Sequence, residues 1–335
     1  MKWILAHWGQ SKRQAFEAVE KALRAIGHSC EWIARNDMQV RDKLIASIKG
    51  GEFDVLLTWQ RFFPMQQDLI TALKESDIQT VYMDFGFHPH YESVVFDTKG
   101  ENAVSSLQEC FENASPTNAI LDRENLDELL EIGHAPLAQI PNHESLERMC
   151  YPFVLVPLQR CGDSVVKYDS RVTDFGHLVR RILVLARGTF FVVCKTHPLD
   201  RNVDLGIPDY IAGNHIVLRE PPGWRNDELG EFLLSRAALV VGVNSNMLFR
   251  ALLYGAPVIA TGRGWYSGSG AVNEVDGVDK LTSLQIPRLN FEARRVFVLS
   301  CLSRQLHLRE LERPGHLLRV LKNAGVSGLE SEPPV

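Results

Sequence analysis

Four polar segments carry the side chains that could do chemistry in this chain of 335 residues. They contain Gln159, Arg160 and Asp163, then Lys195 and His197, then Asn244, Ser245 and Asn246, and finally Gly264 and Tyr266. A carboxylate can attack or stabilise an electrophilic carbon, and an imidazole can donate a proton or a hydrogen bond. Lysine and the free N–H groups at a helix start bind phosphate. This combination favours group transfer from a phosphorylated substrate.

Each segment follows an apolar run of the kind that forms a buried parallel strand. The predicted strands cover 153–157, 190–195, 239–243 and 258–261. Ligands of open α/β sheets bind beyond the carboxyl ends of the strands. We therefore expect all four segments at one ligand-binding edge.

Each of these residues also has an ordinary structural explanation. Asp163 can bond its own backbone in a turn, and a loop histidine such as His197 can be structural or simply solvated. Asn or Ser at 244–246 can cap the following helix, and a side chain that caps a helix can still bind a ligand. The glycine-rich segment 262–270 indicates either a flexible surface loop or a close backbone approach.

Composition limits the class of protein. Hydrophobic residues make up 45% of the chain and charged residues 23%, as in ordinary soluble proteins. The net charge of −5 argues against a broad basic surface, so nucleic acid is not an expected partner. Six widely spaced cysteines without a CxxC pair favour reduced thiols in a cytosol. The apolar start is too short for a signal peptide or a membrane span, which predicts a cytoplasmic protein.

Two further groups of residues suggest weaker hypotheses. The close pair His88 and His90 could coordinate a cation, but an acceptor-binding or solvated loop fits better, and no metal site is predicted. Four basic residues near the C-terminus could together touch an anionic membrane surface, which would place the protein peripherally at the inner membrane: Arg304, Arg309, Arg313 and Lys322.

Strand and helix patterns alternate in both halves of the chain, which predicts two parallel sheets with helices on both faces. We expect a Rossmann-like N-terminal domain over 1–145, with a polar and aromatic loop at 85–102, and helices near 103–113 and 122–132. A second Rossmann-like domain should cover 146–310, ending in a helix over 291–307. A C-terminal helix and tail should follow over 311–335. The predicted class is α/β, with the two domains facing a cleft.

The ordered motifs resemble those of the bacterial capsular-polysaccharide synthesis family, which includes retaining β-Kdo glycosyltransferases. The motifs that carry the resemblance are Val156-Pro157-Leu158-Gln159 with Asp163, Lys195-Thr196-His197-Pro198, Asn244-Ser245, Ala251-Leu252-Leu253-Tyr254-Gly255-Ala256-Pro257-Val258, Gly264-Trp265-Tyr266 and Met83-Asp84-Phe85-Gly86-Phe87-His88-Pro89. They span most of residues 80–310.

The resemblance implies a GT-B fold, CMP-Kdo as the sugar donor, no metal or other cofactor, and a glycan or glycolipid acceptor. It implies that Asp163 is the nucleophile of a retaining reaction and that Lys195 and His197 engage the CMP phosphate. Gln159 and Arg160 would hold the carboxylate of the sugar acid. Ser245 and Asn246 would lie beside the phosphate, while Asp84 and His88 would lie on the acceptor side.

Two departures from the family pattern leave alternatives open. Arg250 stands where the family commonly has Glu, and Ser-Gly-Ser-Gly follows Tyr266 in place of the usual Gly-Leu-Thr. One alternative is a GT-B transferase with another nucleotide sugar or an unusual acceptor such as modified phage DNA. The other is a glycan-binding or assembly protein without catalytic turnover.

Overall fold

The structure is a computed structural model, and it consists of two compact units. The described residues are 1–7, 10–34, 38–59, 67–100, 102–113, 152–160, 162–172, 174–200, 205–207, 214–220 and 228–329. Unit 1 contains Met1–Cys110 together with Ser300–Val335, and unit 2 contains Phe111–Leu299.

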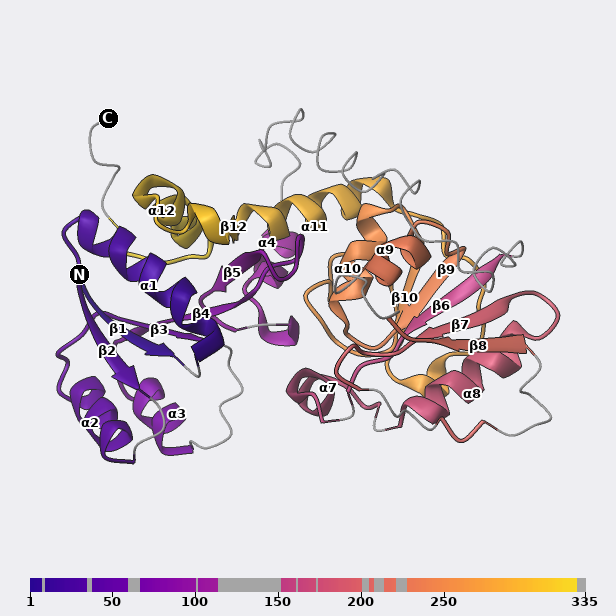
Figure 1. The fold of residues 1–335 in the computed structure, drawn as a ribbon, viewed down its shortest axis with the longest axis horizontal. Coiled ribbons are helices and arrows are strands. Elements are labelled where there is room, and N and C mark those ends of the chain that lie inside the picture. Colours follow the sequence, from indigo (N-terminus) through magenta and orange to yellow (C-terminus); the bar gives the residue numbers. More distant parts are fainter. Residues whose placement is uncertain are drawn as a thin grey trace. The chain divides into compact units, whose positions relative to one another are not determined.

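Unit 1 is a sheet in the order β12-β5-β4-β3-β1-β2 with helices on both faces (Figure 1). Its elements from the first part of the chain are β1 (Lys2–His7), α1 (Gln10–Ala25), β2 (Ser29–Ala34), α2 (Met38–Lys49), β3 (Val55–Trp59), α3 (Gln67–Lys74), β4 (Gln79–Phe85), β5 (Ser93–Asp97), η1 (Asn102–Val104) and α4 (Leu107–Asn113). Strands β2, β1, β3 and β4 are parallel. This is the predicted βαβα arrangement.

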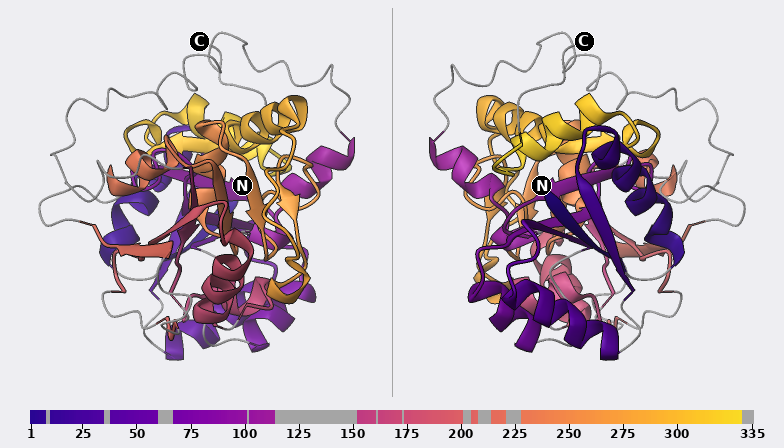
Figure 2. Two further views of the ribbon diagram at one scale, coloured as in Figure 1. Left: turned by 90° about the vertical axis from the view of Figure 1, so that its right-hand side faces the viewer. Right: turned by 90° about the vertical axis from the view of Figure 1, so that its left-hand side faces the viewer.

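The residues of β1 show how the two faces of this sheet are filled. Trp3 and Leu5 pack with α1 and α12 residues in one buried cluster, and Ile4 and Ala6 pack with α2 and α3 residues in another. Successive side chains of a strand point to opposite faces, so a strand covered on both sides needs an unbroken apolar run. The right view of Figure 2 shows this sheet with helices on both of its faces.

The last part of the chain returns to unit 1 as β12 (Gln305–His307), η5 (Leu308–Glu310) and α12 (Pro314–Asn323). Strand β12 pairs antiparallel with β5. A buried ion pair holds this C-terminal segment to the N-terminal part of unit 1. Arg304 Nη1 lies 2.9 Å from Asp97 Oδ2 and 2.6 Å from the Ser106 hydroxyl. Arg304 is therefore unable to reach a membrane surface, which removes it from the predicted basic group.

The predicted helix over 291–307 and loop over 85–102 were both wrong in part. Helix α11 (Phe291–Ser303) ends before β12 begins, and β5 crosses the predicted loop. The two missed strands hydrogen-bond to each other, Leu306 being opposite Val94. Their pairing joins segments about two hundred residues apart in the sequence, so it is absent from any local pattern.

Unit 2 is a second sheet, in the order β11-β10-β9-β6-β7-β8, and all its pairings are parallel. Its elements are β6 (Phe153–Pro157), α7 (Ser164–Asp169), α8 (Phe175–Ala186), β7 (Phe191–Lys195), β8 (His215–Leu218), α9 (Glu228–Leu234), β9 (Leu239–Gly242), α10 (Asn246–Leu253), β10 (Val258–Ala260), β11 (Asn273–Glu274), η4 (Val278–Lys280) and α11. Figure 1 shows α8 on one face of the sheet and α9 with α10 on the other.

The structure divides the chain differently from the predicted domains 1–145, 146–310 and 311–335. Residues 300–310 and the C-terminal helix belong to unit 1, because β12 extends its sheet and α12 covers it. The predicted boundary near 145 and the predicted helix at 122–132 lie outside the described residues. Among the helices of the described part, none is long and apolar enough to cross a membrane.

Candidate functional site

The carboxyl ends of three neighbouring strands form the candidate site in unit 2. Strand β6 pairs with β7 on one side, where Pro157 is opposite Lys195, and with β9 on the other. The predicted segments after β6, β7 and β9 therefore meet at one edge of the sheet, because parallel neighbours end on the same side. This juxtaposition could be predicted from the order of strands and polar segments.

Asp163 caps a helix and also faces His197. Its Oδ1 accepts a hydrogen bond from Val165 N at 3.3 Å at the start of α7. Loss of hydration on burial raises the pKa of the Asp163 carboxyl, while the Val165 N–H and the charges of His197 and Arg160 partly offset this rise. The structural and functional explanations of Asp163 are thus compatible, since only one carboxylate oxygen is used by the cap.

The geometry of His197 selects one tautomer of its ring. Leu199 N donates a hydrogen bond to His197 Nδ1 at 3.1 Å. A neutral imidazole with Nδ1 as acceptor carries its proton on Nε2. Burial lowers the pKa of His197 from 6.5, and the charges of Lys195 and Arg160 lower it further, while Asp163 acts in the opposite direction. At neutral pH His197 therefore offers an Nε2–H donor rather than a positive charge.

Asn244 and Gln159 lock the ends of β6 and β9 together. Gln159 Nε2 donates to Asn244 Oδ1 at 3.0 Å, and Asn244 N donates to Gln159 Oε1 at 3.2 Å. Asn244 Nδ2 also donates to Val165 O at 2.9 Å, and both side chains are buried. These two predicted donor-binding residues therefore shape the site floor, while Arg160 is exposed beside them.

Helix α10 begins at this edge with Ser245 as its N-cap. The Ser245 hydroxyl accepts a hydrogen bond from Met247 N at 3.2 Å, and Asn246 is the first helical residue. The capping explanation is thus correct for Ser245. Leu248 N donates to the Ser245 carbonyl oxygen at 2.9 Å, so the cap residue accepts from two N–H groups of the first turn.

Lys195 forms a buried ion pair that the sequence did not suggest. Its Nζ lies 3.1 Å from Glu220 Oε2, with 2% of the lysine side chain and 12% of the glutamate side chain exposed. The contact has the distance of an ion pair but not the angle of a hydrogen bond. Leu229 N donates to the other Glu220 oxygen at 2.9 Å. Glu220 thereby connects the end of β7 to the start of α9.

The positive charge of Arg250 is balanced by a carboxylate from a neighbouring helix. Its guanidinium contacts Glu231 of α9, and the Tyr254 hydroxyl donates to the same carboxylate. Arg250 is buried, and a Cβ at Gly230 would lie 3.7 Å from it and 3.5 Å from Lys195. Position 250 is thus basic, and α9 supplies the acidic partner.

The glycine-rich segment packs closely rather than forming a flexible loop. The buried Tyr266 hydroxyl lies 2.6 Å from Val243 O and 2.8 Å from Gly262 O, so it donates to backbone carbonyls. A Cβ at Gly264 would approach the Tyr266 ring to 2.7 Å. Burial raises the pKa of Tyr266 well above its usual range. Gly264 and Tyr266 therefore support the end of β9, and a direct contact of either with a ligand stays a prediction.

The predicted acceptor-side residues lie in unit 1, at the carboxyl end of β4. Asp84 Oδ1 accepts a hydrogen bond from Phe85 N at 2.7 Å. Gln305 of β12 holds the next turn, accepting from His88 N at 2.9 Å and donating to His88 O. The role of both residues toward an acceptor stays a prediction.

Several residues of these sites were missed in the sequence. Glu220 lies two residues beyond the end of β8, so its place near a strand end was an available signal. Glu231 had no such signal, because its partner Arg250 is on another helix. Within the described ranges, no group of three or more His, Cys, Asp or Glu side chains could hold a metal ion.

Known proteins share the fold of this chain and part of its sequence pattern. Two solved structures share the fold over most of the chain: a β-Kdo 2,7 transferase of KpsC from Thermosulfurimonas dismutans (15% identity, 93% of this chain and 99% of that chain, TM-score 0.55) and a β-Kdo 2,4 transferase of KpsC from the same organism (15% identity, 88% and 89%, TM-score 0.57). The predicted α/β, GT-B class with two Rossmann-like domains is confirmed.

The family model described as capsule polysaccharide biosynthesis protein matches residues 134–299. This match covers just under half of the chain, and it confirms the resemblance of the motifs to this family. A comparison with curated protein sequences finds no significant match.

Proposed function

We propose that this protein is a glycosyltransferase that transfers Kdo or a related sugar acid from a CMP-sugar to a glycan acceptor, with retention of the anomeric configuration. The observation that carries the proposal is the meeting of Asp163, His197 and the start of α10 at one sheet edge. A carboxylate, a neutral Nε2–H donor and a helix N-terminus match the needs of attack on a sugar carbon with a phosphate leaving group.

The proposed reaction has two displacements. An Asp163 oxygen attacks the anomeric carbon, and the bond from that carbon to the phosphate oxygen breaks, so CMP leaves with the electron pair. The His197 Nε2–H donates a hydrogen bond to the leaving phosphate. The acceptor hydroxyl oxygen then attacks the same carbon and loses its proton to solvent water, while the bond from that carbon to the Asp163 oxygen breaks and restores the carboxylate, which gives net retention.

We propose a different role for Lys195 from the direct contact with the CMP phosphate that the resemblance implies. Its buried pairing with Glu220 means that direct contact with the CMP phosphate would require it to exchange one anion for another. We infer that Lys195 mainly positions His197, which lies two residues further on, and adds positive potential to the edge.

Nucleotide binding tests the donor part of the proposal. Thermal unfolding is measured with CMP, UDP, GDP and ADP, with and without EDTA. CMP should stabilise the protein most, by about 2.7 kcal/mol at a hundredfold excess over its dissociation constant. A clear preference for UDP, or a loss of the stabilisation by CMP when EDTA is added, would contradict the proposed donor chemistry.

The covalent step has its own test. Intact-mass spectrometry of the enzyme with CMP-Kdo and no acceptor should show a sugar adduct, and peptide mapping should locate it on Asp163. The Asp163→Asn variant is the control and should show no adduct. A product with inverted configuration would exclude the double displacement.

A further inference from the structure

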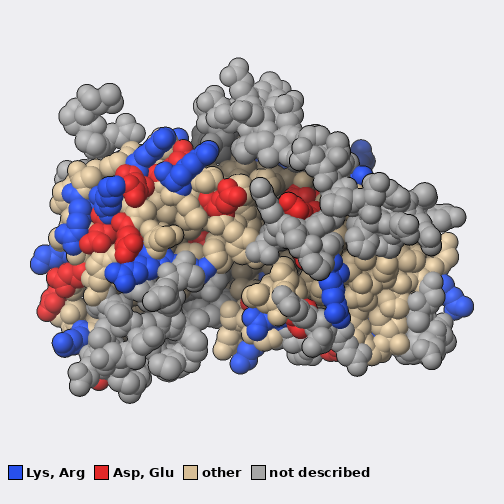
Figure 3. Space-filling view, viewed as in Figure 1, with Lys and Arg blue, Asp and Glu red and all other residues tan. Residues whose placement is uncertain are grey.

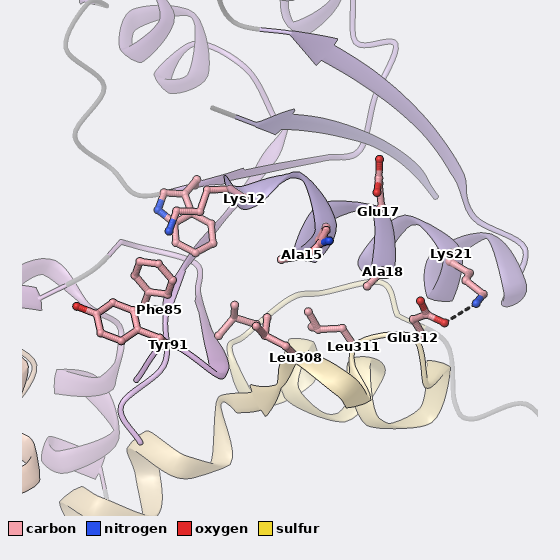
Figure 4. Close-up of a pocket in the computed structure, with 13 residues that line it drawn as sticks. Lys12, Ala15, Glu17, Ala18, Lys21, Phe85, Tyr91, Leu308, Leu311 and Glu312 are labelled. Atoms are coloured by element: carbon pink, nitrogen blue, oxygen red, sulfur yellow. Dashed lines mark hydrogen bonds and ion pairs between the residues drawn. The ribbon is translucent and has the colours of Figure 1, made fainter. Parts of the chain in front are cut away.

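Unit 1 contains a pocket of about 510 Å³ between α1 and the segment 308–312 (Figure 4). Its lining residues all belong to unit 1, so the pocket exists independently of the site in unit 2. One end lies where β3 and β4 finish, at the carboxyl edge where open α/β sheets bind ligands. A volume in this range fits a small organic molecule.

At that end of the pocket, the ammonium of Lys12 is caged between aromatic rings. Lys12 Nζ lies 3.2 Å from the centroid of the Phe85 ring and 4.4 Å from that of Trp59. Tyr91 stacks edge-on against Phe85 with ring centroids 5.1 Å apart. Burial lowers the pKa of Lys12 to about 8, partly opposed by the charge of Asp84. An ammonium that has lost part of its hydration gains most from a counter-anion in contact with it.

The middle of the pocket has an apolar floor, while Gln14 and Glu17 add polar groups on its α1 side. Ala15 and Ala18 lie one turn apart on α1 and leave room above Leu308 and Leu311 (Figure 4). The far end is closed by Lys21, whose ammonium pairs with Glu312. Lys12 to Lys21 is nine residues of helix, so the pocket extends about 13 Å along α1. The Lys21 charge is neutralised by its partner, whereas the Lys12 charge is held between aromatic rings.

We propose that this pocket binds a small amphipathic anion, with its carboxylate or phosphate against Lys12 and its apolar body between α1 and Leu308–Leu311. The Lys12 ammonium between aromatic rings at one end and the apolar floor formed by Leu308 and Leu311 carry the proposal. The pocket is separate from the proposed donor site, because that site contributes no lining residue.

Matched ligands test the proposal by titration calorimetry of the full chain. The probes are 4-cyclohexylbutyrate, the neutral 4-cyclohexylbutanol, and methyl glucuronide as a carboxylate without an apolar body. The butyrate should bind at least about tenfold more tightly than the alcohol, the effect of one charge-assisted contact. Methyl glucuronide binding as tightly as the butyrate would overturn the amphipathic assignment.

Variants locate the contact. Lys12→Met keeps the stem and removes the charge, so it should abolish the preference for the butyrate over the alcohol. Leu308→Asp changes a partly exposed lining residue and should weaken both of these ligands. Lys49→Met, an exposed lysine on α2, is the control and should leave both affinities unchanged. An unchanged preference in Lys12→Met would overturn the proposal. Stabilisation by CMP should persist in Lys12→Met, which separates this test from that of the donor site.

Discussion

Asp163 and His197 each shift the other's pKa toward the charged form, but burial dominates at both. The carboxyl pKa is raised and the imidazole pKa is lowered. A neutral imidazole beside a carboxylate avoids a fully desolvated ion pair in the empty site. Negative charge developing on a leaving phosphate would then meet a hydrogen-bond donor, which suits departure of a nucleotide.

The Asp163→Asn variant removes the charge of residue 163 but keeps its ability to cap α7. Asn caps helices as well as Asp does, so α7 should keep its start. A raised native pKa means that ionised Asp163 reduces stability at neutral pH, and this penalty disappears as pH falls through the native pKa. The variant should therefore unfold at an equal or higher denaturant concentration than the wild type at pH 7, with a smaller difference at pH 4. Transfer should fall by at least about 10³-fold.

Asp163→Ala is the informative contrast. It loses the charge and the cap together, so about 1 kcal/mol of helix stabilisation should be missing relative to Asp163→Asn. Equal stability of the two variants would show that the Val165 hydrogen bond is unimportant. Wild-type transfer rates in either variant would remove Asp163 from the mechanism.

His197 should produce an acid limb in the pH–rate profile. Protonation puts a hydrogen on Nδ1, which breaks the bond from Leu199 N. A histidine with a lowered native pKa binds fewer protons folded than unfolded, so its contribution to stability is lost as pH falls below 6.5. His197→Ala should lower kcat by roughly 10²–10⁴-fold and change CMP affinity much less. Unchanged turnover would assign His197 a structural role only.

At the scale of elements, buried charges connect the helices of unit 2 to its sheet. Glu220 joins the end of β7 to the start of α9, and Glu231 joins α9 to α10 through Arg250. The four groups are two cations and two carboxylates, so the cluster is balanced in charge. Ion pairs of this kind specify an arrangement but add little net stability over apolar residues.

Glu220→Gln should destabilise the protein by about 3–5 kcal/mol, because it leaves the Lys195 ammonium buried without its counter-charge. Denaturant unfolding followed by far-UV circular dichroism measures the loss. Glu228→Gln, at an exposed position at the start of α9, is the control and should change stability by less than about 0.5 kcal/mol.

The double variant Lys195→Met, Glu220→Leu tests the positioning role of Lys195. Replacing both members of a buried pair by apolar residues is often neutral for stability. If Lys195 acts by positioning, CMP should still stabilise this variant measurably. Complete loss of CMP binding in a folded double variant would show direct contact between Lys195 and the phosphate.

At the scale of the whole molecule, two separate parts of the chain together form unit 1. The N-terminal part supplies most of the sheet, and the C-terminal part adds its edge strand β12 and the covering helix α12. Leu317, Val320 and Leu321 of α12 complete the cluster that contains Trp3 and Phe16. Acidic and basic side chains alternate over α1 and α12 on the face shown in Figure 3, without a large patch of one sign. This mixture weakens the hypothesis of a basic membrane-binding surface there.

Removal of residues 300–335 should therefore unfold unit 1, because these residues form part of its sheet and core. The truncation exposes one face of the sheet and leaves Asp97 without Arg304. Limited proteolysis should cut the truncated chain throughout 1–110 while unit 2 stays resistant. Truncation at 330, beyond the described residues, is the control and should behave as the full chain. A truncated protein with full protease resistance would contradict this interdependence of the two ends.

The sequence by itself determined most of the parallel strands of both sheets and the polar segments at their ends. A strand covered on both faces needs an apolar run, and the polar residues after it mark the ligand edge, so both signals are local. Asp163, His197 and Ser245 were found in this way. Only the tertiary structure decided which of the polar residues bond to other side chains. Gln159 bonds to Asn244 and Lys195 pairs with Glu220, and each pair joins the ends of separate strands. Strands β5 and β12 and the caged Lys12 likewise depend on contacts between distant segments, for which no local spacing exists.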